Sequence, residues 1–345
     1  MTLMQQEIHQ QPETIRAVAY AEVEPARCLA QAMRERDIKY AIIAARGTSD
    51  HAATYAQYLL GIENSLPVGL ATPSVQTLYG RKVNYRDALV IGISQSGESP
   101  DVAEVVQSAR EVGALTASIT NNPNSLVART AEFPLRIHSG SEKSVAATKT
   151  YMGTLAVIAL LSELLKGSSD PVAALNDVAD KMTIALKKEE QIARVVERYR
   201  YIQQCAILAR GINWATASEA ALKIIETSYV MARPYSSADF LHGPFALVHA
   251  GFPVMLFASN GPTLGTMHEI ACKLRDNNAE IIAIARSKDI LDTARTAIEV
   301  EFDIEEIYSP LVYIVYGQLF ACHLAQTIGV DPDNPRGLTK VTRTL

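Results

Sequence analysis

The sequence predicts an α/β protein made of two tandem copies of one domain, each a parallel sheet flanked by helices. Two observations support this fold class. Short apolar segments rich in β-branched residues alternate with amphipathic segments, which is typical of parallel sheets with right-handed crossovers. The second observation is an internal repeat with a constant offset along the chain, which indicates a duplicated domain.

The repeat is most visible where "YAIIAARGTS" is set beside "CAILARGIN", because Ala41 then aligns with Ala206, an offset of 206 − 41 = 165 residues. The same offset aligns Ser94 with Ser259, in the turns "SQSGES" and "SNGPT", and Ser144 with Ser309. We therefore divide the chain into a helical segment (1–36), a first domain (37–167), a long helix with the second domain (168–328) and a tail (329–345).

Bulk composition indicates a globular protein. The chain has 345 residues, 48% hydrophobic residues and a net charge of −5 without long runs of one sign, so we expect neither a nucleic-acid partner nor a membrane. The N-terminus has no basic segment followed by an apolar one, which predicts a cytoplasmic protein. The apolar segment "LVYIVYGQLFACHLAQTIG" contains Gln318, His323 and Gln326, which favours a helix buried in protein.

Cysteine and histidine spacing indicates neither disulfides nor a metal site. The four cysteines lie far apart without a C-x-x-C pair, and the seven histidines form no H-x-x-x-H pair, so no metal is expected. Each cysteine is interpreted as a small buried apolar residue. They are Cys28, Cys205, Cys272 and Cys322.

Polar residues crowd the turn that follows the apolar run "ALVIG". In doubly wound sheets, ligands bind beyond the carboxyl ends of the strands, where helix N-termini present free N–H groups. Hydroxyls there, with Gly97 letting the backbone approach, suit a small phosphomonoester, and the chain has no G-x-x-x-x-G-K-[ST] or G-x-G-x-x-G nucleotide motif. The candidate groups are Thr48, Ser49, Ser94, Gln95, Ser96 and Ser99.

Helix capping is the alternative explanation, because most serine-rich turns cap a helix. Taken alone, this turn favours capping. The second copy, however, has "SNGPT" at the aligned place and loses the serine cluster, although both copies need a cap. The comparison therefore favours a binding role for the hydroxyls of the first copy.

Charged residues repeat on one face of the helix "SEAALKIIETSY", where Glu219, Lys223 and Glu226 stand at i, i+4 and i+7. Such a face is usually an exposed salt-bridge ladder. Here apolar residues are interleaved, so the face has little open surface to occupy. His242 follows in "FLHGP", and a histidine can move protons near neutral pH, as can a carboxylate beside an ammonium.

The ordered set "RGTS", "SQSGES", "SVAATKTY", "SEAALKIIETSY", "FLHGP" and "NPRGLTK" resembles the tandem sugar-isomerase (SIS) domains of the isomerase half of glucosamine-6-phosphate synthase. The resemblance covers nearly the whole chain. It implies a flavodoxin-like three-layer sandwich for each domain. It also implies that the six candidate groups hold the sugar phosphate and hydroxyls, with Val145 and Ala146 lining the site.

The resemblance assigns catalytic roles as well. Glu226 would carry the proton between C1 and C2, and Lys223 would stabilise the enolate-like or enolamine oxygen. His242 would open the sugar ring, and Lys340 would approach the sugar carbonyl from the tail. In that family the histidine comes from the neighbouring subunit, which implies a homodimer.

The synthase has an amidohydrolase domain ahead of its SIS domains, whereas this sequence goes from Met1 directly into the SIS unit. We therefore expect no glutamine amidotransferase activity and predict an SIS-type glucosamine-6-phosphate deaminase that releases fructose 6-phosphate and ammonia without a cofactor. A fructosamine-6-phosphate deglycase and another phosphosugar aldose–ketose isomerase remain alternatives. A non-catalytic sugar-phosphate sensor is less favoured, because the first forty residues contain no basic recognition helix.

Overall fold

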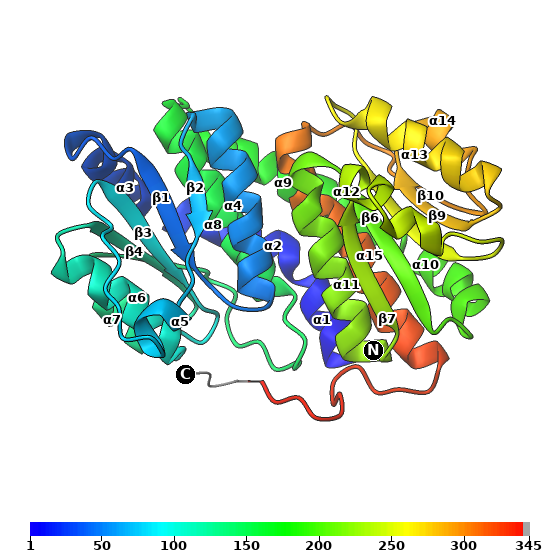
Figure 1. The fold of residues 1–345 in the computed structure, drawn as a ribbon, viewed down its shortest axis with the longest axis horizontal. Coiled ribbons are helices and arrows are strands. Elements are labelled where there is room, and N and C mark those ends of the chain that lie inside the picture. The colour runs from blue at the N-terminus through cyan, green and yellow to red at the C-terminus, as the bar shows by residue number, and fades with distance from the viewer. Residues whose placement is uncertain (341–345) are drawn as a thin grey trace. The chain divides into compact units, whose positions relative to one another are not determined.

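The computed structural model describes residues 1–340 and contains two five-stranded parallel sheets flanked by helices (Figure 1). The predicted α/β class is confirmed. The chain forms two compact units. The first unit contains Gln10–Glu142 and Ala147–Ala179 with Thr339 and Lys340, and the second contains Met1–His9, Lys143–Ala146 and Asp180–Leu338. Residues 341–345 of the predicted tail lie outside the described residues.

The first unit has the strand order β2-β1-β3-β4-β5, with every pairing parallel. All six residues of both β3 and β4 are buried, as expected for strands covered on both faces. The strands are β1 (Tyr40–Ala44), β2 (Val68–Leu70), β3 (Ala88–Ile93), β4 (Leu115–Thr120) and β5 (Phe133–Arg136). The helices are α2 (Gln11–Ala21), α3 (Val23–Glu35), α4 (Thr48–Asn64), α5 (Ser74–Thr77), α6 (Pro100–Glu111), α7 (Leu126–Thr130) and α8 (Lys149–Lys166).

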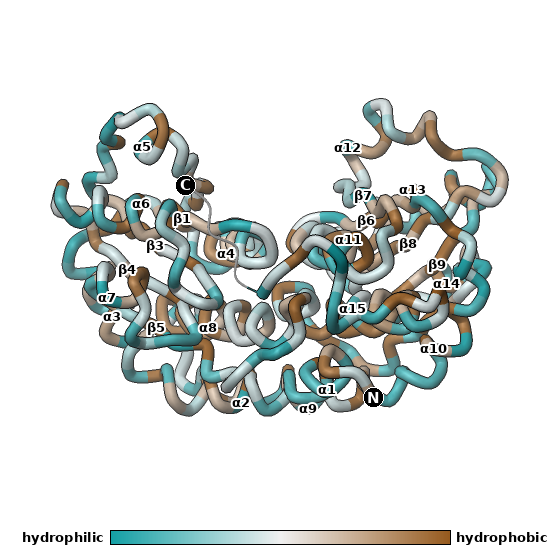
Figure 2. Tube along the Cα trace, turned by 90° about the horizontal axis from the view of Figure 1, so that it is seen from below, coloured by the Kyte–Doolittle hydropathy of each residue, from teal (hydrophilic) through white to brown (hydrophobic). Residues whose placement is uncertain are grey.

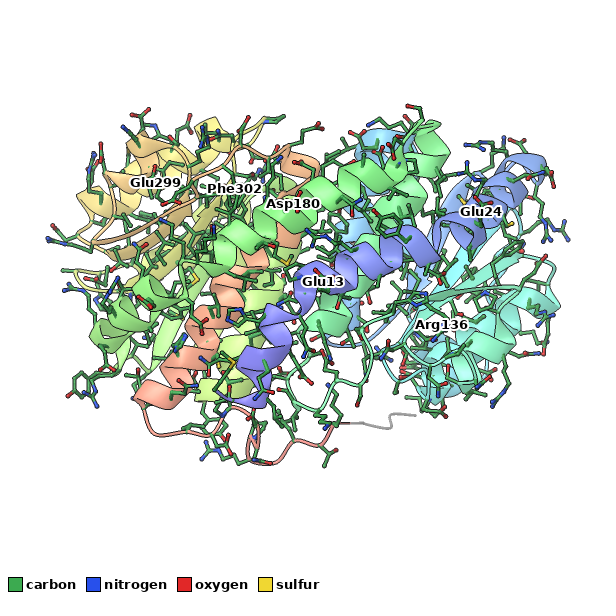
Figure 3. The ribbon with its side chains drawn as sticks, turned by 180° about the vertical axis from the view of Figure 1, so that it is seen from behind. Glu13, Glu24, Arg136, Asp180, Glu299 and Phe302 are labelled. Atoms are coloured by element: carbon green, nitrogen blue, oxygen red, sulfur yellow. The ribbon has the colours of Figure 1, made fainter. Side chains whose placement is uncertain are left out.

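Helix α8 is the central helix of this unit and packs against α2, α3 and α4. It is apolar around most of its surface, and it ends where Gly167 takes the left-handed conformation at φ +82°, a common helix stop. Helices α2 and α3 are amphipathic instead. Glu13 and Glu24 lie on their exposed faces (Figure 3), while Ile15 and Leu29 are fully buried.

The second unit has the strand order β10-β9-β8-β6-β7, also fully parallel. Counted along the chain, this is the same 2-1-3-4-5 order as in the first unit, which is the flavodoxin-like order. The strands are β6 (Gln204–Ala209), β7 (Met231–Ser236), β8 (Pro253–Ala258), β9 (Glu280–Ala285) and β10 (Thr296–Glu299). The helices are α1 (Leu3–His9), α10 (Glu189–Val196), η1 (Glu197–Tyr199), η2 (Gly211–Asn213), α11 (Trp214–Ser228), α12 (Ser237–Leu241), η3 (Pro244–Leu247), α13 (Leu264–Asp276), α14 (Lys288–Leu291), η4 (Glu306–Tyr308) and α15 (Ser309–Thr327).

Helix α15 is the core helix of the second unit and packs along α11. A β-carbon at Gly317 would lie 2.8 Å from the Ala220 β-carbon, so glycine permits this close approach. Residues 306–327 are long and apolar enough to span a membrane, but 89% of the most apolar window is buried inside the fold. This burial agrees with the predicted protein-buried helix. Hydrophobic residues concentrate along the strands and core helices (Figure 2).

The structure refines several predicted elements. The predicted long helix after the first domain divides into α9 (Pro171–Leu186), whose residues are shared between the two units, and α10. Ser309 opens α15, but the aligned Ser144 lies before α8, which begins only at Lys149. The prediction of buried cysteines is wrong at two positions: Cys28 is exposed on α3, and Cys272 is only partly buried. All four are free, and burial raises the pKa of the Cys205 thiol to about 12.

Candidate active site

The polar turns of the first unit follow β1 and β3, which are neighbours at the centre of the sheet. Chain connections leave these two strands in opposite directions, because β2 pairs on the far side of β1 and β4 on the far side of β3. Such a switch point is where open α/β sheets bind ligands. Thr48 begins α4 there, and Ser99 precedes α6.

The turn after β3 is held in shape by its own hydrogen bonds. Ser94 Oγ lies 2.9 Å from Ser99 Oγ and accepts the Gly97 N–H at 3.1 Å. Ser96 Oγ accepts the Glu98 N–H at 3.3 Å. Gly97 has φ +71°, and a β-carbon there would lie 2.0 Å from Ser125 Oγ, so only glycine fits. The hydroxyls are therefore fixed in position before any ligand binds.

The capping alternative finds no support at Ser99. This residue is the N-cap of α6, yet its side chain makes no capping bond. Ser125, by contrast, accepts the Ala128 N–H at the start of α7. The Ser99 hydroxyl is instead in hydrogen-bond contact with Ser94 Oγ within the turn.

An ion pair that we did not predict joins the two polar turns. Arg46 Nε lies 2.8 Å from Asp101 Oδ2, and the Asp101 side chain is fully buried. Its other oxygen accepts the Val102 N–H at 2.9 Å. The sequence signal was an arginine in "RGTS" and an acidic residue in the first turn of α6.

Three of the predicted residues, Thr48, Ser49 and Gln95, line one cavity of about 20 Å³. This volume holds a single water. The other lining residues come from the segment that includes the start of α8, and we did not predict them as site residues. They are Ala147, Thr150, Tyr151 and Thr154.

Glu142 anchors both the start of α8 and the tail. Its carboxylate accepts the N–H groups of Thr148 and Thr150 at 2.9 and 3.1 Å, and the Lys340 ammonium at 2.7 Å. Burial alone would raise the pKa of this carboxyl, but Lys340 and the threonine donors hold the pKa below its ordinary value of 4.5. The tail lysine is thus a fixed cation.

Val145 and Ala146 belong to a short segment of the second unit. Glu7 of α1 holds this segment, because its carboxylate accepts the N–H groups of Lys143 and Ser144, the latter at 3.1 Å. Glu7 itself is 5% exposed. The predicted lining residues therefore follow directly after a segment fixed by a buried carboxylate.

The charged face of α11 is buried as expected for Glu219 and Lys223, whose side chains are 0% exposed, whereas Glu226 is 21% exposed. Lys223 Nζ lies 3.3 Å from Glu219 Oε1 and 2.6 Å from Glu226 Oε2. Burial by itself would lower the pKa of Lys223, but the two carboxylates hold it above its ordinary value. Lys223 is therefore a permanent cation beside an accessible carboxylate.

His242 lies apart from this pair, exposed on the segment after α12. Among the described residues, the structure does not bring it into hydrogen-bond contact with Glu226. Gly243 follows with φ +140°. The neighbouring Leu241 and Leu247 are 43% and 51% exposed.

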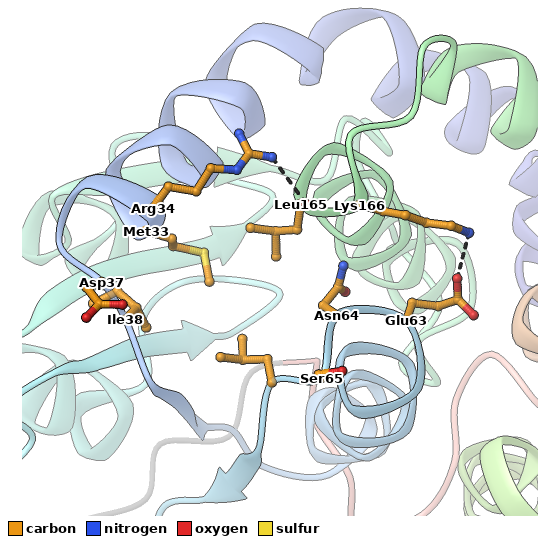
Figure 4. A pocket seen from close by; sticks show the side chains of 10 residues that line it. Met33, Arg34, Asp37, Ile38, Glu63, Asn64, Ser65, Leu165 and Lys166 are labelled. Carbon is orange, nitrogen blue, oxygen red and sulfur yellow. Dashed lines mark hydrogen bonds and ion pairs between the residues drawn. The ribbon is translucent and has the colours of Figure 1, made fainter.

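A larger cavity of about 350 Å³ lies elsewhere in the first unit, where α3, α4 and α8 end (Figure 4). None of the predicted site residues lines it. Arg34 donates to the Leu165 carbonyl at 3.2 Å, and Lys166 pairs with Glu63 at 2.6 Å (Figure 4). Ile38 lies shortly before β1 begins, so this cavity is at the opposite end of the sheet from the polar turns.

Two flavodoxin-like sheets, one with a serine turn at its switch point, define a duplicated α/β protein. A family model of the SIS domain matches residues 36–164 and 202–328. The chain belongs to the SIS domain family, which confirms the resemblance drawn from the motifs.

Similar proteins include a glutamine–fructose-6-phosphate aminotransferase [isomerizing] of Thermococcus kodakarensis, 32% identical over 98% of this chain and 57% of that protein. The chain thus spans little more than half of that relative. A protein of Silicibacter pomeroyi described as a candidate phosphosugar isomerase is 31% identical, with a TM-score of 0.87 over 96% of this chain and 100% of that one. The C-terminal domain of a glucosamine-fructose-6-phosphate aminotransferase of Francisella tularensis is 25% identical, with a TM-score of 0.86 over 97% of this chain and 98% of that one.

Proposed function

We propose that the chain is a phosphosugar enzyme with aldose–ketose isomerase chemistry, and specifically a glucosamine-6-phosphate deaminase. The observation that carries this proposal is the contact between Lys223 and Glu226 at 2.6 Å. A buried cation beside a partly exposed carboxylate supplies a proton carrier together with a fixed positive charge. Moving a proton between adjacent sugar carbons requires both.

The phosphate of the substrate is assigned to the first copy. The hydroxyls of Ser94, Ser96 and Ser99, at the N-terminus of α6, form an anion cradle of the kind found at helix N-termini. Thr48, Ser49 and Gln95 would bind the remaining sugar oxygens. Arg46 adds positive charge between the two turns, although Asp101 balances much of it.

The reaction follows from these groups. His242 protonates the ring oxygen and opens glucosamine 6-phosphate to its aldehyde. Glu226 removes the C2 proton, and Lys223 stabilises the negative charge that develops on the C1 oxygen of the enolamine. Glu226 then returns the proton to C1, which leaves an imine at C2. Water adds to this imine and ammonia leaves, so glucosamine 6-phosphate and water give fructose 6-phosphate and ammonia. Lys340, held by its ion pair with Glu142, would contact the sugar carbonyl.

The choice of substrate draws on the relatives. The names of both aminotransferases refer to fructose 6-phosphate and to amino transfer, and that of the Thermococcus protein also to isomerisation. This chain matches the C-terminal domain that the Francisella structure contains. An amino group at C2 and a phosphate at C6 are therefore the substrate features we assign. In the direction of ammonia release, water is the only second reactant.

We further propose that the chain acts as a homodimer in which His242 serves the partner's site. The exposed Leu241 and Leu247 beside it are the kind of apolar surface that association buries.

The test is an assay of ammonia and fructose 6-phosphate from glucosamine 6-phosphate, with a fructosamine 6-phosphate as the competing substrate. Equal amounts of both products, absent in Glu226→Gln, are expected. Ketose phosphate without ammonia would assign a plain isomerase. Turnover of the fructosamine phosphate alone would assign a deglycase, and binding without turnover would assign a sensor.

A further inference from the structure

The second copy has a polar turn at the same place in its sheet as the serine turn of the first. Strand β8 ends at Ala258 and the turn begins at Ser259, just as β3 ends at Ile93 and its turn begins at Ser94. Helix α13 starts after this turn, as α6 starts after the other. The second copy therefore retains the position of an anion cradle.

A carboxylate of the chain itself occupies this place. Glu306 Oε1 accepts a hydrogen bond from Ser259 Oγ at 3.3 Å and another from Thr263 Oγ1. The side chain also lies over Gly261, where a β-carbon would be 2.7 Å from Glu306 Oε2. Two hydroxyls thus hold one oxyanion, and the missing β-carbon of Gly261 leaves room for it.

Hydrogen bonds among buried residues fix the position of Ser259 and of the Glu306 backbone. Asn213 Nδ2 donates to Ser259 Oγ at 3.0 Å and to Ser309 Oγ at 2.7 Å. Ser309 Oγ in turn donates to the Glu306 carbonyl at 2.7 Å. Ser259, Asn213 and Ser309 are at most 1% exposed, so this is a built site and not a surface contact.

The first copy lacks the occupant. The offset of 165 residues places Ser141 opposite Glu306, and Ser141 is exposed. In that copy Ser94 bonds to Ser99 and to the Gly97 N–H instead. One of the two aligned turns thus holds a glutamate carboxylate, whereas the serine of the other is bonded within its own turn.

We propose that Glu306 is an internal substitute for phosphate, and that its carboxylate is what closes the second copy to phosphate esters and confines them to the first. A phosphate in this cradle would have to displace a carboxylate and its hydrogen bonds. The cradle is therefore a latent site for a phosphate monoanion or dianion. The inference rests on the proposed function only where it assigns phosphate to the first copy.

The test replaces the occupant by its first-copy counterpart, Glu306→Ser, with the exposed neighbour Glu305→Ser as the matched control. The probe is inorganic phosphate, followed through the backbone amide signals of Gly261 and Thr263. In Glu306→Ser these signals should shift on addition of phosphate. The affinity for phosphate should be at least about tenfold above that of wild type, because a charge-assisted hydrogen bond contributes about that much. Adding Ser259→Ala should weaken the new site again.

Thermal unfolding supplies a second readout that does not require the variant to fold well. Phosphate should raise the Tm of Glu306→Ser more than that of Glu305→Ser, because the ligand binds only the folded state. If Glu306→Ser is unfolded, phosphate should restore its fold. Equal phosphate effects on both variants, or failure to restore the fold, would overturn the inference.

The same titration separates this inference from the proposed function. Amide shifts in the Ser94–Ser99 turn of wild type report the proposed phosphate cradle. If those shifts are absent while Gly261 responds in Glu306→Ser, the proposed function loses its cradle and the latent site stands.

Discussion

Lys223 and Glu226 lie in contact but differ in exposure, and this difference assigns their roles. Lys223 is completely buried between two carboxylates, so it stays charged and cannot exchange protons with a substrate. Glu226 keeps part of its surface open. In the proposed reaction, the partly exposed carboxylate is therefore the group that contacts the reacting carbons, while the lysine acts through its charge.

Glu226→Gln should lower kcat by about 10²–10⁴-fold with little change in KM, because the amide keeps the shape of the side chain but cannot accept the C2 proton. Solvent-deuterium exchange into an acyclic substrate analogue is the direct measurement. Exchange should vanish in Glu226→Gln and survive in His242→Asn, since an acyclic analogue needs no ring opening. The reverse pattern would exchange the two assigned roles.

Ser96 and Ser259 allow the two cradles to be compared by matched substitutions. Ser96 is half-buried with its hydroxyl bonded only within the turn, so Ser96→Ala should reduce kcat/KM by roughly ten- to a hundredfold and leave stability nearly unchanged. Ser259 is 1% exposed and bonds Asn213 and Glu306. Ser259→Ala should therefore cost about 1–3 kcal/mol of unfolding free energy and leave kcat/KM alone. Steady-state kinetics and thermal unfolding of both variants provide the check, and equal kinetic losses would mean that both copies bind phosphate.

At the scale of elements, Glu142 explains why the two copies differ where their long helices begin. Helix α15 starts at Ser309, whereas α8 starts five residues after the aligned Ser144. The Glu142 carboxylate accepts hydrogen bonds from the N–H groups of Thr148 and Thr150. These bonds satisfy N–H groups at the start of α8 that an earlier helical turn would otherwise satisfy. The irregular segment before α8 contains Val145 and Ala146, the predicted lining residues.

The same carboxylate should make stability depend on pH. The folded pKa of Glu142 is lowered, so its contribution is present above the ordinary value of 4.5 and is lost as pH falls through the folded value. Glu142→Gln should be less stable than wild type at neutral pH by about 1–3 kcal/mol, and the difference should shrink in acid. Denaturant unfolding at several pH values measures this. Glu111→Gln, which removes an exposed ion pair with Lys82, is the control and should change the unfolding free energy little. A stability difference for Glu142→Gln that stays constant at all pH values would contradict the assignment.

At the scale of the whole molecule, the sequence predicted what depends on local pattern. The duplication, the parallel sheets and the buried face of α11 follow from periodicity and from apolar residues interleaved with Glu219 and Lys223. Glu142 and Glu306 were not predicted, because their roles arise from partners that only the fold brings near, such as Lys340 for the first and Ser259 for the second. The sequence around an acidic residue does not show which hydroxyl or ammonium its carboxylate will contact in the fold.

At the same scale, the proposed homodimer predicts which chain supplies the histidine of each site. His242 is exposed and is flanked by exposed leucines, so we expect it to enter the site of a partner chain. Glu226→Gln and His242→Asn should each be nearly inactive on cyclic glucosamine 6-phosphate. Unfolded and refolded together, they form mixed dimers in which one site joins an intact Glu226 to an intact His242.

Random pairing makes about half of the dimers mixed, each with one of two sites restored, so activity should recover to about a quarter of wild type. If His242 acted within its own chain, every site in a mixed dimer would carry one defect and nothing would be recovered. Refolding each variant alone is the control for recovery by refolding itself. Size-exclusion chromatography with light scattering on the same samples establishes whether dimers form, so a lack of recovery from a proven dimer would place the histidine in its own chain's site.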